Sequence, residues 1–186
     1  MRKIIALFLL CFAIPCAAEA GDFLYFKKRP TAGGTCATQS VDVSLTTNNT
    51  NSIFYSSDER GQSWTAGVSK TLYSLTFYRT DSGTGYTQTI RIGTSTNLTS
   101  PLVEYTCSMR ATAGSQECII PEAGRPALTA STAYYVGIHT GGQWSIARDS
   151  AGGYAGGTGY FDATSSDWTL STTSVSDLYF ITKMCD

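Results

Sequence analysis

Apolar and polar residues alternate in short runs along most of the chain after residue 21, and turn-forming residues separate these runs. A period of two is typical of β-strands that place one face on a core, whereas helical spacing of apolar residues is rare here. The pattern predicts strands at residues 69–78, 88–93, 102–107, 133–139 and 178–182. The sequence therefore favours an all-β fold.

Two of these strands have a clear buried face. In the first, Tyr73, Leu75 and Phe77 would share one face, and in the fourth Tyr134, Val136 and Ile138 would point to one side, as expected when one sheet face packs on a core. Segments rich in Gly, Pro, Asp and Ser separate the strands, at residues 80–85, 121–126, 141–142 and 152–159. Many short strands without covering helices predict an antiparallel β-sandwich of the jelly-roll type.

The first twenty residues predict export. Arg2 and Lys3 precede an apolar run at 4–14, and small residues follow it up to Ala20, as in a cleaved signal peptide. The run is too short for a bilayer core, which needs about twenty residues. We expect a signal peptide at 1–20, an N-terminal strand and link at 21–35, a single β-sandwich domain at 36–186, and a secreted protein, extracellular or periplasmic.

Four cysteines remain after removal of that peptide, an even number in an oxidising compartment. Cys107 and Cys118 flank a polar stretch that suits a hairpin tip, so we predict that they pair with each other. Cys36 and Cys185 are left to form the second disulfide, which would tie the two ends of the domain together. The cysteines include no CxxC pair, so a zinc site is disfavoured.

The charge balance argues against nucleic acid or anionic lipid as a partner. The chain has 13 basic and 14 acidic residues, and removal of residues 1–20 leaves a net charge near −2. Binding to nucleic acid depends on a basic patch that displaces counterions.

Catalytic patterns are weak. The single histidine, His139, has Ser145 and Asp149 nearby in sequence, but no GxSxG motif precedes them. A polysaccharide-acting enzyme would need two facing carboxylates, for which Asp149, Asp162 and Asp177 are candidates. Aspartates in Gly/Ser-rich loops more often cap turns, so we expect no catalysis and no cofactor.

The same three carboxylates, Asp149, Asp162 and Asp177, are the candidate ligands of a structural calcium ion, which takes oxygen ligands from loops. The chain has no DxDxDG array. The calcium site therefore stays an alternative to turn capping.

Aromatic residues in the C-terminal third are the better clue to function. Sugar rings stack on Trp and Tyr and hydrogen-bond to neighbouring polar groups. The predicted ligand-binding residues are Trp168, Tyr154, Tyr160, Asp167 and Arg148. We expect Trp64 and Trp144 to lie in the core.

The order of several motifs resembles bacterial secreted jelly-roll modules of the choice-of-anchor or carbohydrate-binding-like type. The similarity covers about residues 52–181, with its motifs at 62–66, 72–75, 128–136, 154–157, 167–168 and 177–180. The resemblance implies an extracellular, non-catalytic sandwich in which glycan binding is expected.

The leading hypothesis is therefore a secreted binding module for a glycan or cell-surface polymer. A structural alternative is a self-assembling surface subunit, in which residues 22–29 add a strand to a neighbouring copy as a homo-oligomer contact.

Overall fold

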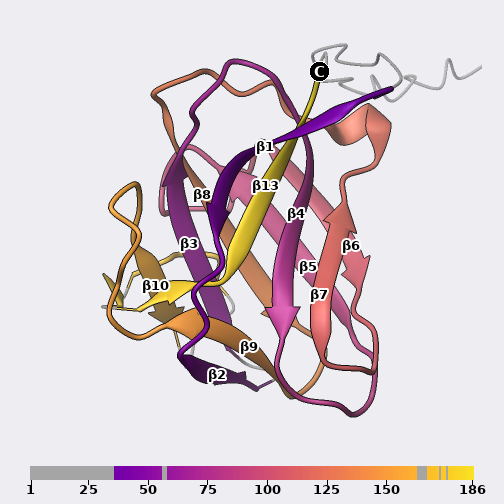
Figure 1. Ribbon diagram of the computed structural model, residues 1–186, viewed down its shortest axis with the longest axis vertical. Helices are drawn as coiled ribbons and strands as arrows, with labels where there is room; N and C mark the ends of the chain where they lie inside the picture. The colour runs from indigo at the N-terminus through magenta and orange to yellow at the C-terminus, as the bar shows by residue number, and fades with distance from the viewer. Residues whose placement is uncertain (1–35, 56–57, 163–166, 172, 175) are drawn as a thin grey trace, which may run out of the picture.

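The computed structural model describes residues 36–55, 58–162, 167–171, 173–174 and 176–186 (Figure 1). These residues are nearly all β, in two antiparallel sheets. The strands are β1 (Gln39–Leu45), β2 (Thr50–Phe54), β3 (Glu59–Thr65), β4 (Thr71–Arg79), β5 (Thr87–Gly93), β6 (Val103–Ser108), β7 (Gly114–Ile119), β8 (Ala133–Thr140), β9 (Trp144–Asp149), β10 (Gly159–Asp162), β11 (Thr173–Ser174), β12 (Asp177–Leu178) and β13 (Phe180–Cys185). A short 3₁₀ helix, η1 (Glu122–Gly124), lies between β7 and β8.

Eight strands form a jelly roll. In one sheet β1, β13, β4 and β7 pair in that order, and in the other β3, β8, β5 and β6 do. Along the chain every connection between successive frame strands leads from one sheet to the other, except that from β5 to β6. The predicted antiparallel jelly-roll sandwich is confirmed, and we call these eight strands the frame.

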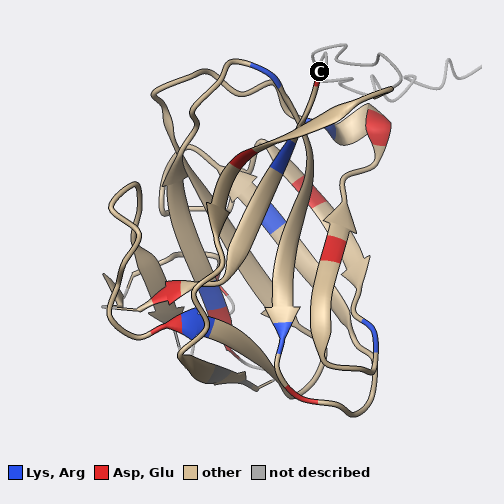
Figure 2. Ribbon diagram, in the orientation of Figure 1, with Lys and Arg blue, Asp and Glu red and all other residues tan. Residues whose placement is uncertain are grey.

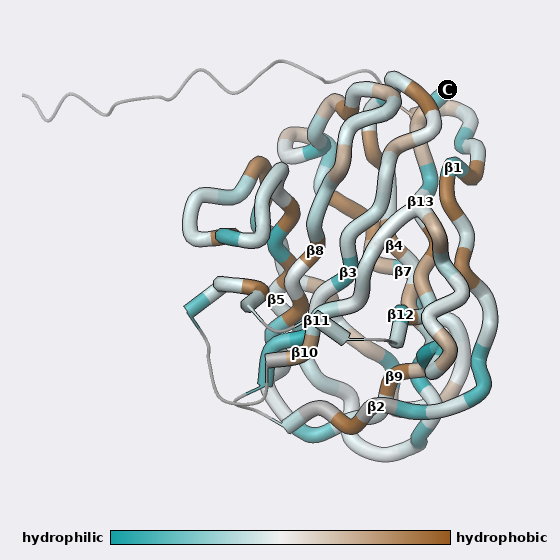
Figure 3. The backbone as a smooth tube through the Cα atoms, turned by 90° about the vertical axis from the view of Figure 1, so that its left-hand side faces the viewer, coloured by the Kyte–Doolittle hydropathy of each residue, from teal (hydrophilic) through white to brown (hydrophobic). Residues whose placement is uncertain are grey.

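The remaining strands, β2 and β9 to β12, extend both sheets at one end of the frame (Figures 1 and 3). β9 pairs with β2 and β12 and meets β4 at a single position, whereas β10 pairs with the first half of β3 and with β11. We call these five strands the annex. Four of them come from the chain between β8 and β13.

The core lies between the two sheets of the frame. Trp64 is fully buried, with its ring centroid 5.8 Å from that of Tyr134 and 6.3 Å from that of Phe180. Trp144 on β9 is also buried, so the prediction that both tryptophans are core residues is confirmed. Apolar side chains from both sheets thus close over one interior.

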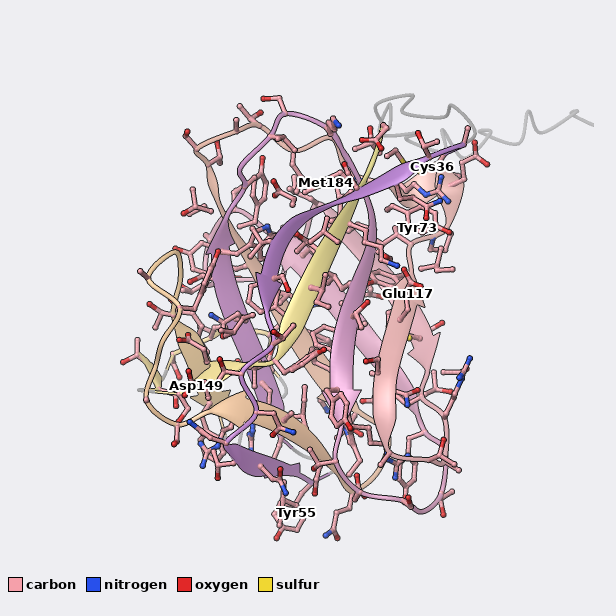
Figure 4. All side chains as sticks on the ribbon, viewed as in Figure 1. Cys36, Tyr55, Tyr73, Glu117, Asp149 and Met184 are labelled. Carbon is pink, nitrogen blue, oxygen red and sulfur yellow. A yellow bond between two sulfur atoms is a disulfide. The ribbon has the colours of Figure 1, made fainter. Side chains whose placement is uncertain are left out.

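The predicted strands correspond to β4, β5, β6, β8 and β13, but the face of β4 differs at one position. The pairing of β4 with β13 shifts between Ser74 and Leu72, which leaves Tyr73 as the extra residue of a bulge. Leu72 therefore joins Leu75 in the core, and Tyr73 is only partly buried (labelled in Figure 4). The prediction that Tyr73 shares a face with Leu75 was wrong, because strict alternation ignores a bulge.

Both predicted disulfides are present. Cys36 and Cys185 join the start of the described chain to the end of β13, with their Cα atoms 5.2 Å apart (Figure 4). The Cα atoms of Cys107 and Cys118 are 5.5 Å apart. β6 and β7 do not form the expected hairpin, because they pair with different sheets, so this disulfide links the two layers at their edge.

The predicted signal peptide at 1–20 and the N-terminal strand at 21–35, including residues 22–29, lie outside the described residues. Among the described residues, no helix has the length and apolar character needed to cross a membrane.

Candidate ligand-binding site

A cavity of about 550 Å³ lies where the annex meets the beginning of β3. This volume falls within the range of about 300–1,000 Å³ typical of small-molecule sites. Its lining residues come from β2, the following turn, β3, β9 and β10: Asn51, Ile53, Tyr55, Asp58, Arg60, Arg148 and Phe161. Figure 4 shows Tyr55 at this end of the molecule, opposite the end that holds Cys36.

A buried ion pair stabilises one wall of the cavity. Arg60 Nη2 lies 3.0 Å from Asp58 Oδ2, and both side chains are almost completely buried. The same guanidinium donates hydrogen bonds to the carbonyl oxygens of Glu59 and Ile53. Because its charge is compensated and its donors are used, Arg60 is a structural part of the wall, and it holds β2 against β3.

Phe161 covers this ion pair from β10. The Arg60 guanidinium carbon lies 3.5 Å from the centre of the Phe161 ring, a close cation–π contact. Phe161 is nevertheless 36% exposed. Its ring therefore offers one face to Arg60 and keeps part of its surface available to the cavity.

Arg148 differs from three other arginines in charge compensation. Arg60, Arg79 and Arg91 each form a salt bridge with a carboxylate. Among the described residues, no carboxylate lies within 4.0 Å of the Arg148 guanidinium. Its Nη1 donates a long hydrogen bond of 3.3 Å to Ser176 Oγ, and its buried Nε has no hydrogen-bond partner in the described part of the chain.

The lining therefore has one uncompensated positive charge, because two guanidinium groups face one carboxylate. Figure 2 shows charged residues of both signs gathered at this end of the sandwich, near β9 and the start of β3.

The rim of the cavity is apolar and exposed. Ile53 is 45% exposed and Tyr55 is 52% exposed. With Phe161, they make three of the seven large hydrophobic side chains that are exposed in the described chain. Apolar residues gathered beside a few polar groups are the usual composition of a ligand site.

The structure does not bring the five predicted ligand-binding residues into one site. Arg148 lines the cavity. Tyr154 packs against the core, with its ring 5.5 Å from that of Phe180, and burial raises the pKa of its phenol. Tyr160 packs beside Tyr135 on the outer face of the β3–β8 sheet, and burial also raises its pKa.

Trp168 and Asp167 lie in a segment that covers the outer face of the same sheet. The Arg91 guanidinium carbon is 4.2 Å from the centre of the Trp168 ring, and the His139 ring is 5.9 Å away. Trp168 has a φ of 62°, which is uncommon for a non-glycine residue. Asp167 Oδ1 accepts a hydrogen bond from the Thr169 backbone N–H, so it stabilises the local turn.

Glycines make room for this covering segment. Leu170 and Leu98 are buried on the sheet, and their chain segments are joined by a short bridge between Asn97 and Thr169. A Cβ added at Gly61 would lie 2.7 Å from Leu170, and one added at Gly137 would lie 2.7 Å from Leu98. The leucines therefore contact the backbone of β3 and β8 directly.

The aspartates considered for calcium and for catalysis accept hydrogen bonds from amides. Asp149 Oδ1 accepts from Asn49 Nδ2 and from the Ala151 backbone N–H, whereas Asp177 accepts from Gln62 Nε2 and the Tyr154 backbone N–H. No group of three or more metal-ligating side chains occurs among the described residues.

The Asp162 side chain lies outside the described part of the structure. Asp149, the first of these three aspartates, is labelled in Figure 4.

The histidine and its sequence neighbours do not form a triad. His139 lies on β8 of one sheet, whereas Ser145 and Asp149 lie on β9 of the other. The Ser145 backbone N–H donates to Asp81, and the ring next to His139 is that of Trp168.

Of the residues that line the cavity, only Arg148 was predicted from the sequence to bind a ligand. Ile53 and Tyr55 belong to a short apolar run after an Asn-rich segment, and this run was the available signal. The sequence holds no comparable signal at Arg60 and Asp58, because charged residues at the start of a strand normally indicate a solvent-exposed end. The chain matches no protein-family model, and the searches of curated proteins and of solved structures found no match.

Proposed function

We propose that this chain is a secreted, non-catalytic binding module that holds a glycan of a cell surface or extracellular matrix in the cavity between β2, β3, β9 and β10. The observation that carries the proposal is the meeting of exposed apolar groups and hydrogen-bonding groups in one concave site. Tyr55 and Phe161 provide flat apolar surfaces, and Asn51 and Arg148 provide donors and an acceptor.

These groups suit a sugar ring. Its C–H face packs against an aromatic ring, and its hydroxyl groups need both donors and acceptors. The Tyr55 side chain can supply both, because it combines a large apolar body with a polar hydroxyl. Residues that stiffen the wall, Arg60 and Asp58, keep the site formed in the absence of ligand.

Secretion is consistent with the two disulfides and with the apolar segment at residues 4–14. Disulfides persist in oxidising compartments. The secreted location and the resemblance to carbohydrate-binding-like modules belong to this proposal.

A glycan array with Tyr55→Ala tests the proposed site. We expect wild-type protein to bind a defined set of glycans and Tyr55→Ala to lose at least about tenfold in affinity, which corresponds to about 1.4 kcal/mol. Leu102→Ala is the matched control, because Leu102 is 53% exposed but does not line the cavity. Equal losses in both variants, or no glycan binding by wild type, would contradict the proposal.

Trp168→Ala separates this site from the aromatic site predicted from the sequence. If the cavity is the binding site, Trp168→Ala should keep wild-type affinity, because Trp168 does not line the cavity and packs against Arg91 on the outer face of the β3–β8–β5 sheet. Loss of binding in Trp168→Ala with full binding in Tyr55→Ala would move the site to that face.

A further inference from the structure

We infer that the cavity selects a sugar that carries a carboxylate, with Arg148 as the residue that binds the carboxylate group. This inference rests on the proposed function and names the ligand class of the same site. The evidence is the charge state of the lining and the incomplete hydrogen bonding of Arg148.

A partly buried guanidinium normally has an acidic partner, because removing a charge from water is costly unless it is paired. Arg60 and Arg79 satisfy this requirement with Asp58 and Asp81. Arg148 has a hydrogen bond to the neutral hydroxyl of Ser176 and a buried Nε that lacks a partner among the described residues. A ligand carboxylate at the cavity would compensate this charge.

The amount of charge favours a single carboxylate. The lining residues carry one net positive charge, since the Arg60–Asp58 pair is internally neutral. A dianionic phosphate would keep an uncompensated negative charge beside Ile53 and Phe161. A carboxylate carries one negative charge and also matches the planar guanidinium in hydrogen-bond geometry.

The position of Arg148 suits a ligand that also stacks. Arg148 comes from β9, whereas the exposed apolar groups come from β2, the turn after it and β10. The β9 wall therefore provides the uncompensated charge, while β2, the turn after it and β10 provide exposed apolar surface. A uronic acid has this combination, because its ring carries the carboxylate at one edge and C–H groups on its faces.

Matched pairs of oligosaccharides test the inference. The probes are oligogalacturonates and the same oligomers as methyl esters, together with sulfated oligosaccharides of similar length, measured by isothermal titration calorimetry. We expect wild type to bind the free acid at least about tenfold more tightly than its ester, as for a hydrogen bond to a charged group. Arg148→Gln should abolish this preference, so that the variant binds the acid and the ester with equal affinity within about threefold.

Arg148→Lys and Arg110→Gln complete the series. Lysine keeps the charge but not the planar fork, so Arg148→Lys should keep part of the preference for the acid. Arg110 is exposed and does not line the cavity, so Arg110→Gln makes the same change in net charge and should behave as wild type. Thermal melting checks that each variant folds, and Arg148→Lys still tests the inference if Arg148→Gln does not fold.

The outcomes separate this inference from the proposed function. Equal binding of acid and ester by wild type would overturn the carboxylate inference and leave glycan binding intact. An acid preference that persists in Arg148→Gln, or stronger binding of the sulfated probes, would also overturn it. Absence of binding to the acidic probes and to every neutral glycan of the array would overturn both.

Discussion

The frame and the annex are both built from β-strands, but they differ in the side chains that they bury. The frame closes an apolar interior, in which side chains such as Trp64, Phe77 and Ile90 are fully buried. The annex adds Trp144, Ile146 and Leu178 to this interior, but it also holds buried polar contacts, in which Asp149 and Asp177 accept amide hydrogen bonds. The difference shows that strands added at one end of the jelly roll can hold polar groups and a cavity that the frame itself does not provide.

The largest expected effect is on the frame. Trp64→Ala removes a fully buried indole that contacts Tyr134 and Phe180. We expect the free energy of unfolding to fall by about 3–5 kcal/mol, since deleting a large core side chain leaves a cavity. Urea denaturation followed by circular dichroism measures this loss. A change below about 1 kcal/mol would show that the core does not depend on this residue.

The junction between frame and annex should give the next largest effect. Asp58→Ala leaves the buried Arg60 guanidinium without its carboxylate. Breaking a buried ion pair costs about 3–5 kcal/mol, and we expect about 3 kcal/mol because two backbone carbonyls still accept from Arg60.

Asp58→Asn is the matched control for the junction. It keeps the size and an acceptor oxygen, so its loss in urea denaturation should be smaller than that of Asp58→Ala. If both variants are as stable as wild type, the ion pair does not join annex to frame.

The same contrast explains how much of the fold could be predicted from the sequence. Alternation around Tyr134 and Val136 identified β8, and the cysteine spacing identified both disulfides. β3 was missed because its buried residues include Arg60 and Gln62, which are polar but have partners elsewhere in the chain. Alternation of apolar and polar residues reveals a buried strand only where the buried side chains are apolar.

The candidate site was harder to predict for a related reason. Arg148 was identified as a ligand-binding residue and lies in the cavity, whereas Trp168 packs on the opposite sheet. Trp168 has polar neighbours in the sequence, which suggested an exposed side chain. Its actual exposure depends on segments that are distant in the sequence, since it packs against Arg91 and His139. Tyr55 and Arg148 line one cavity because β2 pairs with β9, with Thr50 opposite Arg148 and Phe54 opposite Trp144.

The loop that holds Leu98, between β5 and β6, and the segment around Trp168, after β10, together cover the outer face of the frame, and Gly137→Ala tests these contacts. The added Cβ would lie 2.7 Å from Leu98 Cδ1 and 3.5 Å from Trp168 Cε3. We expect a loss of about 1–3 kcal/mol from overpacking, measured by thermal denaturation. Gly83→Ala is the control, because its Cβ would meet only Arg79 Nη2 at 3.5 Å. Equal stability of the two variants would mean that the covering segment shifts freely.

The smallest effect should be on the pH dependence of stability, through Asp81. Burial raises the pKa of Asp81, but hydrogen bonds from Arg79 and the Ser145 backbone N–H outweigh it and lower the pKa below its usual value of 3.8. The carboxylate joins β4 of the frame to β9 of the annex. A pKa lowered by folding means that its stabilisation is present above about pH 4 and is lost as the pH falls through the lower folded value.

Asp81→Asn should therefore lower the free energy of unfolding by less than about 1 kcal/mol at pH 7, because the carboxylate is partly exposed and screened. The stability curves of variant and wild type should converge as the pH falls below about 3, measured by urea denaturation across pH. Glu122→Gln is the control, since this exposed carboxylate has no side-chain hydrogen bond within the described chain. A difference that stays constant from pH 7 to pH 2 would show that Asp81 joins frame and annex by shape and hydrogen bonding, without a contribution from its charge.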